Sequence, residues 1–178
     1  GKVAPDTLGH FQIHEHIWVH HTPLADKNPA LRIDDYEKSL AELKCYRNAG
    51  GGGFADAQPV AAGRNAEMMK KLSEESGVHI VASTGYHLNA FYPDNCWIHS
   101  LGEEELFALY TSELESGMLA WQEDPTVKPE RTDIKAGLVK AAIPAEGPVG
   151  RYEILLRAAA RAAAGSHVPL MIHTEKGL

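Results

Sequence analysis

The sequence is poor in cysteine, in positive charge and in long apolar runs, and each scarcity excludes a class of protein. Its 178 residues hold only two cysteines, Cys45 and Cys96, so no disulfide framework is expected. The 17 lysines and arginines are outnumbered by 24 aspartates and glutamates, and the formal net charge of -7 argues against a nucleic-acid partner. No stretch approaches the roughly 20 consecutive apolar residues of a membrane span. We therefore expect neither nucleic acid nor a membrane as a partner.

The first residues of the chain also lack the pattern of a secretory signal, which is a basic segment followed by an apolar one. Together with the scarce cysteines, this favours a cytoplasmic location. The composition is 44% hydrophobic and 23% charged, as in an ordinary globular protein. By length alone, 178 residues would make one domain.

Hydrophobic periodicity and turn residues predict an alternation of strands and helices. Strands are expected over residues 11–16, 54–57, 78–84, 136–143 and 168–174, and helices within residues 31–50, 65–76, 103–116 and 151–164. Such an alternation is typical of a parallel sheet with right-handed crossovers. The glycine run at residues 50–53 follows a helix and precedes a strand, so we interpret it as a helix C-cap and tight turn rather than a phosphate cradle.

Ten histidines are the unusual feature, and five of them fall between His10 and His21. His14 and His16 lie at the end of the first predicted strand. Because side chains alternate along a strand, both point to one face and Glu15 to the other. Two imidazoles about 7 Å apart along a strand can converge on one metal ion. The alternative is a pair of solvated surface histidines, which is the reading we keep for His10, His20 and His21.

The fourth and fifth predicted strands carry further polar residues in apolar surroundings. Lys140 lies within AGLVKAAI, where a lysine is costly unless its charge is paired or removed. It could pair with Glu146 or Glu175 at the strand end, or its nitrogen could be modified or held neutral for chemistry. His173 ends the fifth strand and suits a ligand or an isolated rim histidine. Since active sites of parallel α/β folds lie at the carboxyl ends of strands, these side chains are expected on one face.

Four segments carry a resemblance to a known family. They are DTLGHFQIHEH, GGGGFADAQPVAAGRNAEMMKKLSEESGVHIVASTGYH, IKAGLVKAAI and VPLMIHTEKG. Together they resemble the phosphotriesterase family of the amidohydrolase superfamily, including its lactonases and phosphotriesterase homology proteins. The resemblance extends from about Thr7 to the last residue.

The resemblance implies a (β/α)8 TIM barrel with two divalent metal ions, usually zinc. It implies that His14 and His16 hold the more buried ion, that carboxylated Lys140 bridges both ions, and that His173 holds the second. A metal-activated water would then cleave a lactone, a carboxylic ester or a phosphoester. The small-molecule substrate could meet Tyr86, His87 and Phe91 in the loop after the third strand, with packing as their alternative role. His87 in particular could contact an anionic group, such as a phosphate on a sugar lactone.

The chain departs from the family pattern in extent. Members of the family also use a histidine after the sixth strand and an aspartate after the eighth, whereas residues 1–178 accommodate five strands and four helices. We therefore expect the N-terminal part of one barrel domain, with strands six to eight absent and an open edge that favours a homodimer. Two alternatives to a hydrolase stay open. One is a catalytically incompetent metal-binding fragment, and the other is an open flavodoxin-like sheet that binds a nucleotide.

Overall fold

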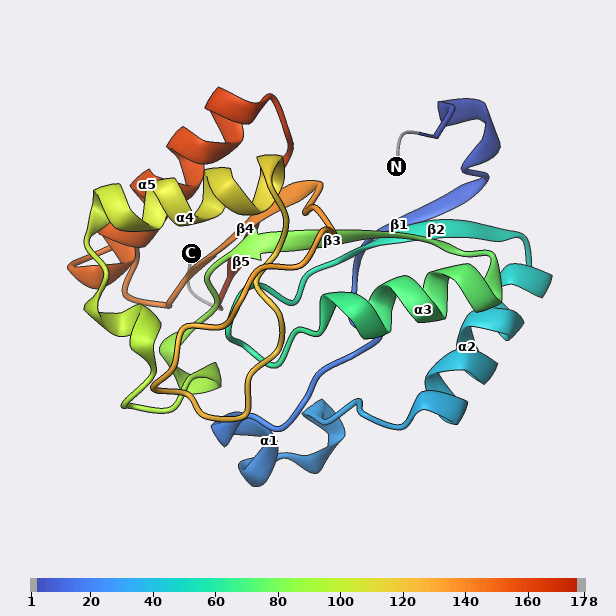
Figure 1. Ribbon diagram of the computed structural model, residues 1–178, viewed down its shortest axis with the longest axis horizontal. Coiled ribbons are helices and arrows are strands. Elements are labelled where there is room, and N and C mark those ends of the chain that lie inside the picture. Colours follow the sequence, from blue (N-terminus) through green and yellow to red (C-terminus); the bar gives the residue numbers. More distant parts are fainter. Residues whose placement is uncertain (1–2, 176–178) are drawn as a thin grey trace.

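Residues 3–175, which the computed structural model describes, contain one parallel sheet that curves into part of a barrel (Figure 1). Its strands follow one another in chain order: β1 (His10–Glu15), β2 (Gly51–Asp56), β3 (His79–Gly85), β4 (Leu138–Ile143) and β5 (Leu170–Thr174). All neighbouring pairs are parallel. The partial-barrel fold is therefore confirmed, and every predicted strand is present with its ends shifted by a few residues.

Helices cover the outer face of this sheet and connect its strands. The four predicted crossovers are α2 (Tyr36–Asn48), α3 (Ala66–Ser76), α4 (Glu103–Glu115) and α5 (Arg151–Ser166). A short α1 (Pro23–Lys27) was not predicted. Its signal is local, because the Thr22 side chain accepts a hydrogen bond from the Ala25 N–H and Pro23 opens the first turn. Within the described residues, no helix combines the length and apolarity needed to cross a membrane.

The crossover helices begin and end where their capping residues require. In α3, the Asn65 side chain accepts a hydrogen bond from the Met68 N–H, and Gly77 closes the helix in the left-handed conformation at φ 70°. The alanine-rich face of α5 buries Ala158, Ala159 and Ala162. Because these side chains are small, α5 can pack closely against α4 and the sheet (Figure 1).

The interpretation of the glycine run as a turn is wrong for three of its four residues. Gly51, Gly52 and Gly53 form the first half of β2, and only Gly50, at φ 96°, makes the turn. Because these glycines have no side chain, neighbouring parts of the chain can pack closely against them. A Cβ atom on Gly52 would lie 1.4 Å from the Leu8 carbonyl oxygen, and one on Gly53 would lie 2.6 Å from that of His79.

A buried ion pair joins the segments that follow β2 and β3. Arg64, in the loop after β2, donates to the Glu113 carboxylate of α4 from Nη2 to Oε1 at 2.6 Å and from Nη1 to Oε2 at 2.8 Å. Arg64 Nη1 also donates to the Ser83 carbonyl of β3, and Glu113 accepts from the Leu119 N–H. One buried pair thus fixes a loop, a strand, a helix and the segment after that helix.

Replacement of Arg64 tests how much the fold depends on this pair. Arg64→Leu would leave Glu113 charged and buried without its partner, so we expect the free energy of unfolding to fall by about 3–5 kcal/mol. The matched control is Arg161→Leu, which removes an exposed Arg161 pairing with Glu103 and Glu104 and should leave stability nearly unchanged. Urea unfolding followed by circular dichroism measures both. Equal losses in the two variants would contradict the prediction.

Candidate functional site

His14 and His16 lie together at the carboxyl end of β1, as their spacing predicts. Their ring centroids are 5.5 Å apart with the planes at 64°. His16 Nδ1 is buried and has no hydrogen-bond partner in the structure. Burial, followed by the charges of His14 and Lys140, lowers the pKa of His16 to about 4. His16 is therefore a neutral imidazole near pH 7, and the lone pair of a ring nitrogen is available to bind a metal ion.

Lys140 is the most unusual side chain at this end of the sheet. Its exposed fraction is 0%, and within the described residues Nζ has one polar contact, the Met171 sulfur at 3.8 Å. Across residues 3–175, no carboxylate lies within ion-pair distance of Nζ, so the alternative pairing with Glu146 or Glu175 is not seen. Burial lowers the pKa of Lys140 to about 8, although the charge of Asp56 opposes the shift. A buried ammonium without a carboxylate is costly, which favours a neutral or modified nitrogen.

His173 and His87 complete the cluster. His173 lies on β5, which is adjacent to the strand that carries Lys140. It is paired with Ala142 of β4. The ring centroids of His87 and His173 are 5.2 Å apart. Burial is the main cause that lowers the pKa of each histidine in the cluster, and the charge of Lys140 contributes in every case: His14, His16, His87 and His173. The sheet therefore brings the side chains from β1, β3, β4 and β5 into one electrostatically coupled group.

Two buried residues that we did not predict support the β1 histidines from β2. The Asp56 carboxylate accepts hydrogen bonds from the Ile17 N–H at 3.0 Å and from the Gln58 N–H at 2.9 Å. Asp56 is fully buried, and burial raises its pKa to about 7 against the effect of these two donors and of Arg64. The Gln58 amide donates to the Ala62 carbonyl and lies beside His16. The signal in the sequence was the position of Asp56 at a strand end, where the other site residues were found.

The residues proposed to contact the substrate lie in two different surroundings. Tyr86 is buried and stacks on Tyr92 with centroids 4.1 Å apart, and its hydroxyl bonds to Asn89 and His99 at 3.0 Å. Phe91 instead packs on the His87 ring with centroids 4.0 Å apart. The structure thus places Phe91 and His87 beside the cluster and Tyr86 beneath the loop. Substrate contact by these residues stays a prediction.

The cluster does not by itself contain a complete metal site of the common type. In the part of the chain that the structure describes, no three His, Cys, Asp or Glu side chains are grouped so that they could hold a metal ion. Metal ligation here therefore stays a prediction, in which Lys140 is the residue that the family resemblance adds to the histidines. The end of the HTEKG segment, residues 176–178, lies outside the described residues.

Asp56 offers a test of how the end of β1 is held. Asparagine has one acceptor oxygen where aspartate has two, so Asp56→Asn leaves one buried backbone N–H unpaired. We expect a loss of about 1–3 kcal/mol in the free energy of unfolding. The control is Asp124→Asn, since Asp124 also accepts two hydrogen bonds, from Thr126, but is exposed. Denaturant titration of both variants would contradict the prediction if Asp56→Asn lost no more stability than the control.

Comparison with solved structures identifies the class of fold. A lactonase from Listeria monocytogenes matches 98% of this chain and 55% of its own, with a TM-score of 0.80 and 26% sequence identity. The five strands and their crossover helices therefore correspond to part of a TIM barrel of the amidohydrolase type. Within that class, the sequence matches the Phosphotriesterase family over residues 1–178, and the chain belongs to that family.

The curated relatives carry hydrolase names. A phospho-furanose lactonase from Mycoplasmopsis agalactiae is 28% identical over 182 residues, which covers 99% of this chain and 51% of the relative. An N-acetyltaurine hydrolase from Danio rerio is 25% identical over 203 residues, covering 97% of this chain and 54% of the relative. The chain thus spans about half the length of the curated relatives it matches.

Proposed function

We propose that this chain is part of a metal-dependent hydrolase in which a water activated by two divalent metal ions cleaves a lactone, a carboxylic ester or a phosphoester. The observation that carries the proposal is Lys140. It is fully buried, with no carboxylate partner among residues 3–175, in a group of histidines whose pKa values are lowered. A positive charge there is unfavourable, whereas a carboxylated nitrogen would be an anionic oxygen ligand.

The residues present fit a binuclear metal centre. His16 Nδ1 is a buried nitrogen without a partner, and the low pKa values of His14, His16 and His173 keep these imidazoles neutral, as metal ligands must be. His14 and His16 would hold one ion, His173 would hold the second, and carboxylated Lys140 would supply an anionic oxygen ligand to the pair. Two zinc ions, when bound, would polarise the scissile bond and lower the pKa of a bound water. The depressed pKa of Lys140 makes its neutral amine available for carboxylation.

The geometry of His87 supports a role as a hydrogen-bond donor to the substrate. Its Nδ1 accepts a hydrogen bond from the Leu88 N–H at 2.7 Å, so the proton of the neutral ring is on Nε2. Burial lowers the pKa of His87 far below neutrality, which maintains this neutral form. His87 would therefore donate from Nε2 to an oxygen of the substrate. This agrees with an anionic group such as a phosphate on a sugar lactone, and the name of the Mycoplasmopsis relative supports that substrate class.

The alternative to a hydrolase is a metal-binding fragment without turnover. Its support is the share of the relatives' length that the chain covers.

A homodimer is also proposed, because Ile13 on β1 and Ile172 on β5, at the two outer strands, are 78% and 44% exposed. A carboxamide substrate is a second candidate for the hydrolase, since one relative is named for hydrolysis of N-acetyltaurine.

Replacement of Lys140 tests the metal centre. Lys140→Met removes the bridging group but fills the same apolar space, so we expect zinc content and lactone turnover to fall at least about 100-fold while the metal-free protein keeps or gains stability. Lys135→Met, an exposed lysine in the same segment, is the matched control and should change neither. Metal analysis after dialysis and hydrolysis of a lactone panel supply the readings. Full zinc content in Lys140→Met would refute the ligand assignment, and zinc without turnover in the unmodified protein would favour the fragment.

Replacement of His87 tests the substrate contact. His87→Phe keeps a ring against Phe91 but removes the donor, so kcat/KM for a phosphorylated lactone should fall about 10- to 100-fold more than for the unphosphorylated lactone. His87→Gln retains a donor and should recover part of the preference. An unchanged ratio between the two substrates in His87→Phe would overturn the role given to His87.

A further inference from the structure

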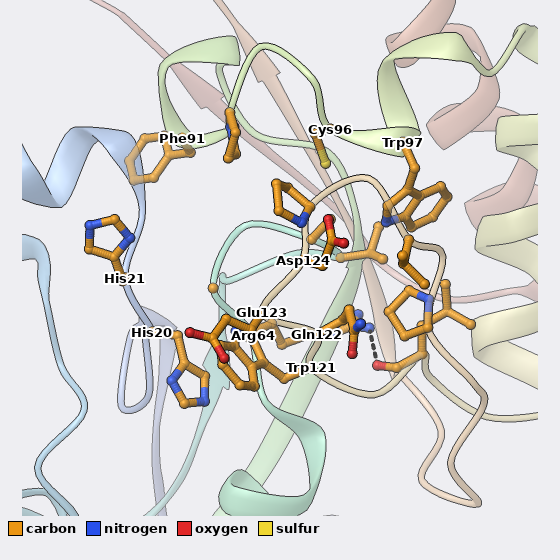
Figure 2. A pocket seen from close by; sticks show the side chains of 18 of the residues that line it. His20, His21, Arg64, Phe91, Cys96, Trp97, Trp121, Gln122, Glu123 and Asp124 are labelled. Carbon is orange, nitrogen blue, oxygen red and sulfur yellow. Dashed lines mark hydrogen bonds between the residues drawn. The ribbon is translucent and has the colours of Figure 1, made fainter.

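A cavity lies on the far side of Phe91 from His87 and shares none of the proposed ligand residues. It has a volume of about 480 Å³ and is bounded by the loops that follow β1, β2 and β3 and by residues 119–129, which precede β4 (Figure 2). His14, His16, Lys140 and His173 do not line it. Phe91 is the link, because it lines this cavity and also packs on the ring of His87.

The walls of the cavity are rich in aromatic rings. Trp121 stacks on His20 with centroids 4.0 Å apart and planes at 26°, and 37% of Trp121 is exposed. Trp97 and Phe91 form other parts of the lining (Figure 2). The Nζ atom of Lys128 already lies 5.7 Å from the centroid of the Trp97 ring, so this aromatic surface attracts a cation from the chain itself.

The unbalanced charge in the lining is negative. Arg32 is paired with Asp34 at 2.6 Å, and Arg64 is paired with the buried Glu113. Glu123 and Asp124 also line the cavity, and neither forms an ion pair with a cation among residues 3–175. The arginines of the lining are thus neutralised by their partners. Lys128, which lies over Trp97, offsets one of the two carboxylates, so the surroundings of the cavity stay negative.

The wall that carries these carboxylates is fixed in place by backbone contacts. Residues 118–133 return on themselves, with the Ala120 N–H donating to the Glu130 carbonyl at 2.9 Å and a bridge between Leu119 and Arg131. At the tip, the Trp97 N–H donates to the Pro125 carbonyl at 2.9 Å. Because the tip is joined to the loop after β3, Trp121 and the carboxylates are held over the cavity before any ligand arrives.

We propose that this cavity binds a small organic cation that carries a planar ring, such as an arylalkylammonium ion. The ring would lie against Trp121, since Lys128 already lies over Trp97, and the ammonium group would be attracted by the aromatic face and by Glu123 and Asp124. The site is separate from the proposed metal centre and does not depend on the reaction there.

Three ligands of similar size and different charge test the proposal on the full chain. Benzyltrimethylammonium, benzyl alcohol and benzoate are titrated while the fluorescence of the three tryptophans is followed. We expect the cation to bind about 5- to 30-fold more tightly than the alcohol, and benzoate to bind least. Equal affinities, tighter binding of benzoate, or no saturable binding of the cation would each overturn the proposal.

Variants locate the binding. Trp121→Ala should weaken cation binding, and the double variant Glu123→Gln/Asp124→Asn should remove most of the preference for the cation over the alcohol. A control double variant, Glu42→Gln/Glu115→Gln, makes the same change of charge at exposed positions outside the cavity and should have no effect. Cation affinity should also be unchanged in Lys140→Met, so failure of the proposed hydrolase would leave this result intact. Loss of binding in Lys140→Met, or none in either cavity variant, would refute the location.

Discussion

The buried pair of Arg64 and Glu113 is the interaction on which the arrangement of the loops depends. The two side chains are separated by 49 residues, and neither could stay charged in the core without the other. Their hydrogen bonds to Ser83 and Leu119 attach the loop after β2 and the segment after α4 to the centre of the sheet. The site and the aromatic cavity both border these segments, so one pair determines the shape of the surface above the strands.

Lys140 is also a basic side chain buried in the core, but its surroundings are the opposite of those of Arg64. Arg64 is buried together with a carboxylate and two carbonyl groups, whereas Lys140 is buried beside a thioether and several neutral imidazoles. A structural lysine in the core would be expected to find a partner of opposite charge. Its absence within the described residues is the reason that chemistry, rather than packing, explains this side chain best. The same surroundings keep the histidines neutral, which is the state that binds a metal ion.

The histidine cluster and the aromatic cavity differ in the charge of their side chains. Around Lys140, burial is the main cause that lowers the pKa values of the four histidines, and the charge of Lys140 adds to it. On the other side of Phe91, the carboxylates of Glu123 and Asp124 leave the aromatic cavity negative. An anionic substrate group and an organic cation would therefore be separated by a single aromatic ring. Such a division lets neighbouring sites select ligands of opposite charge.

The sequence alone determined the order of strands and helices, because periodicity, capping residues and β-branched runs act over a few neighbours. It also predicted that His14, His16, Lys140 and His173 lie together at the strand ends, since polar residues at the ends of apolar strands stand out. Only the tertiary structure decided that Gly51–Gly53 belong to a strand, because the reason is the close approach of the Tyr46 ring to Gly51 and of other backbone segments to Gly52 and Gly53. The partners of Asp56 and Arg64 and the aromatic cavity were likewise beyond the sequence, since they join side chains distant in the chain whose contacts depend on how the sheet curves.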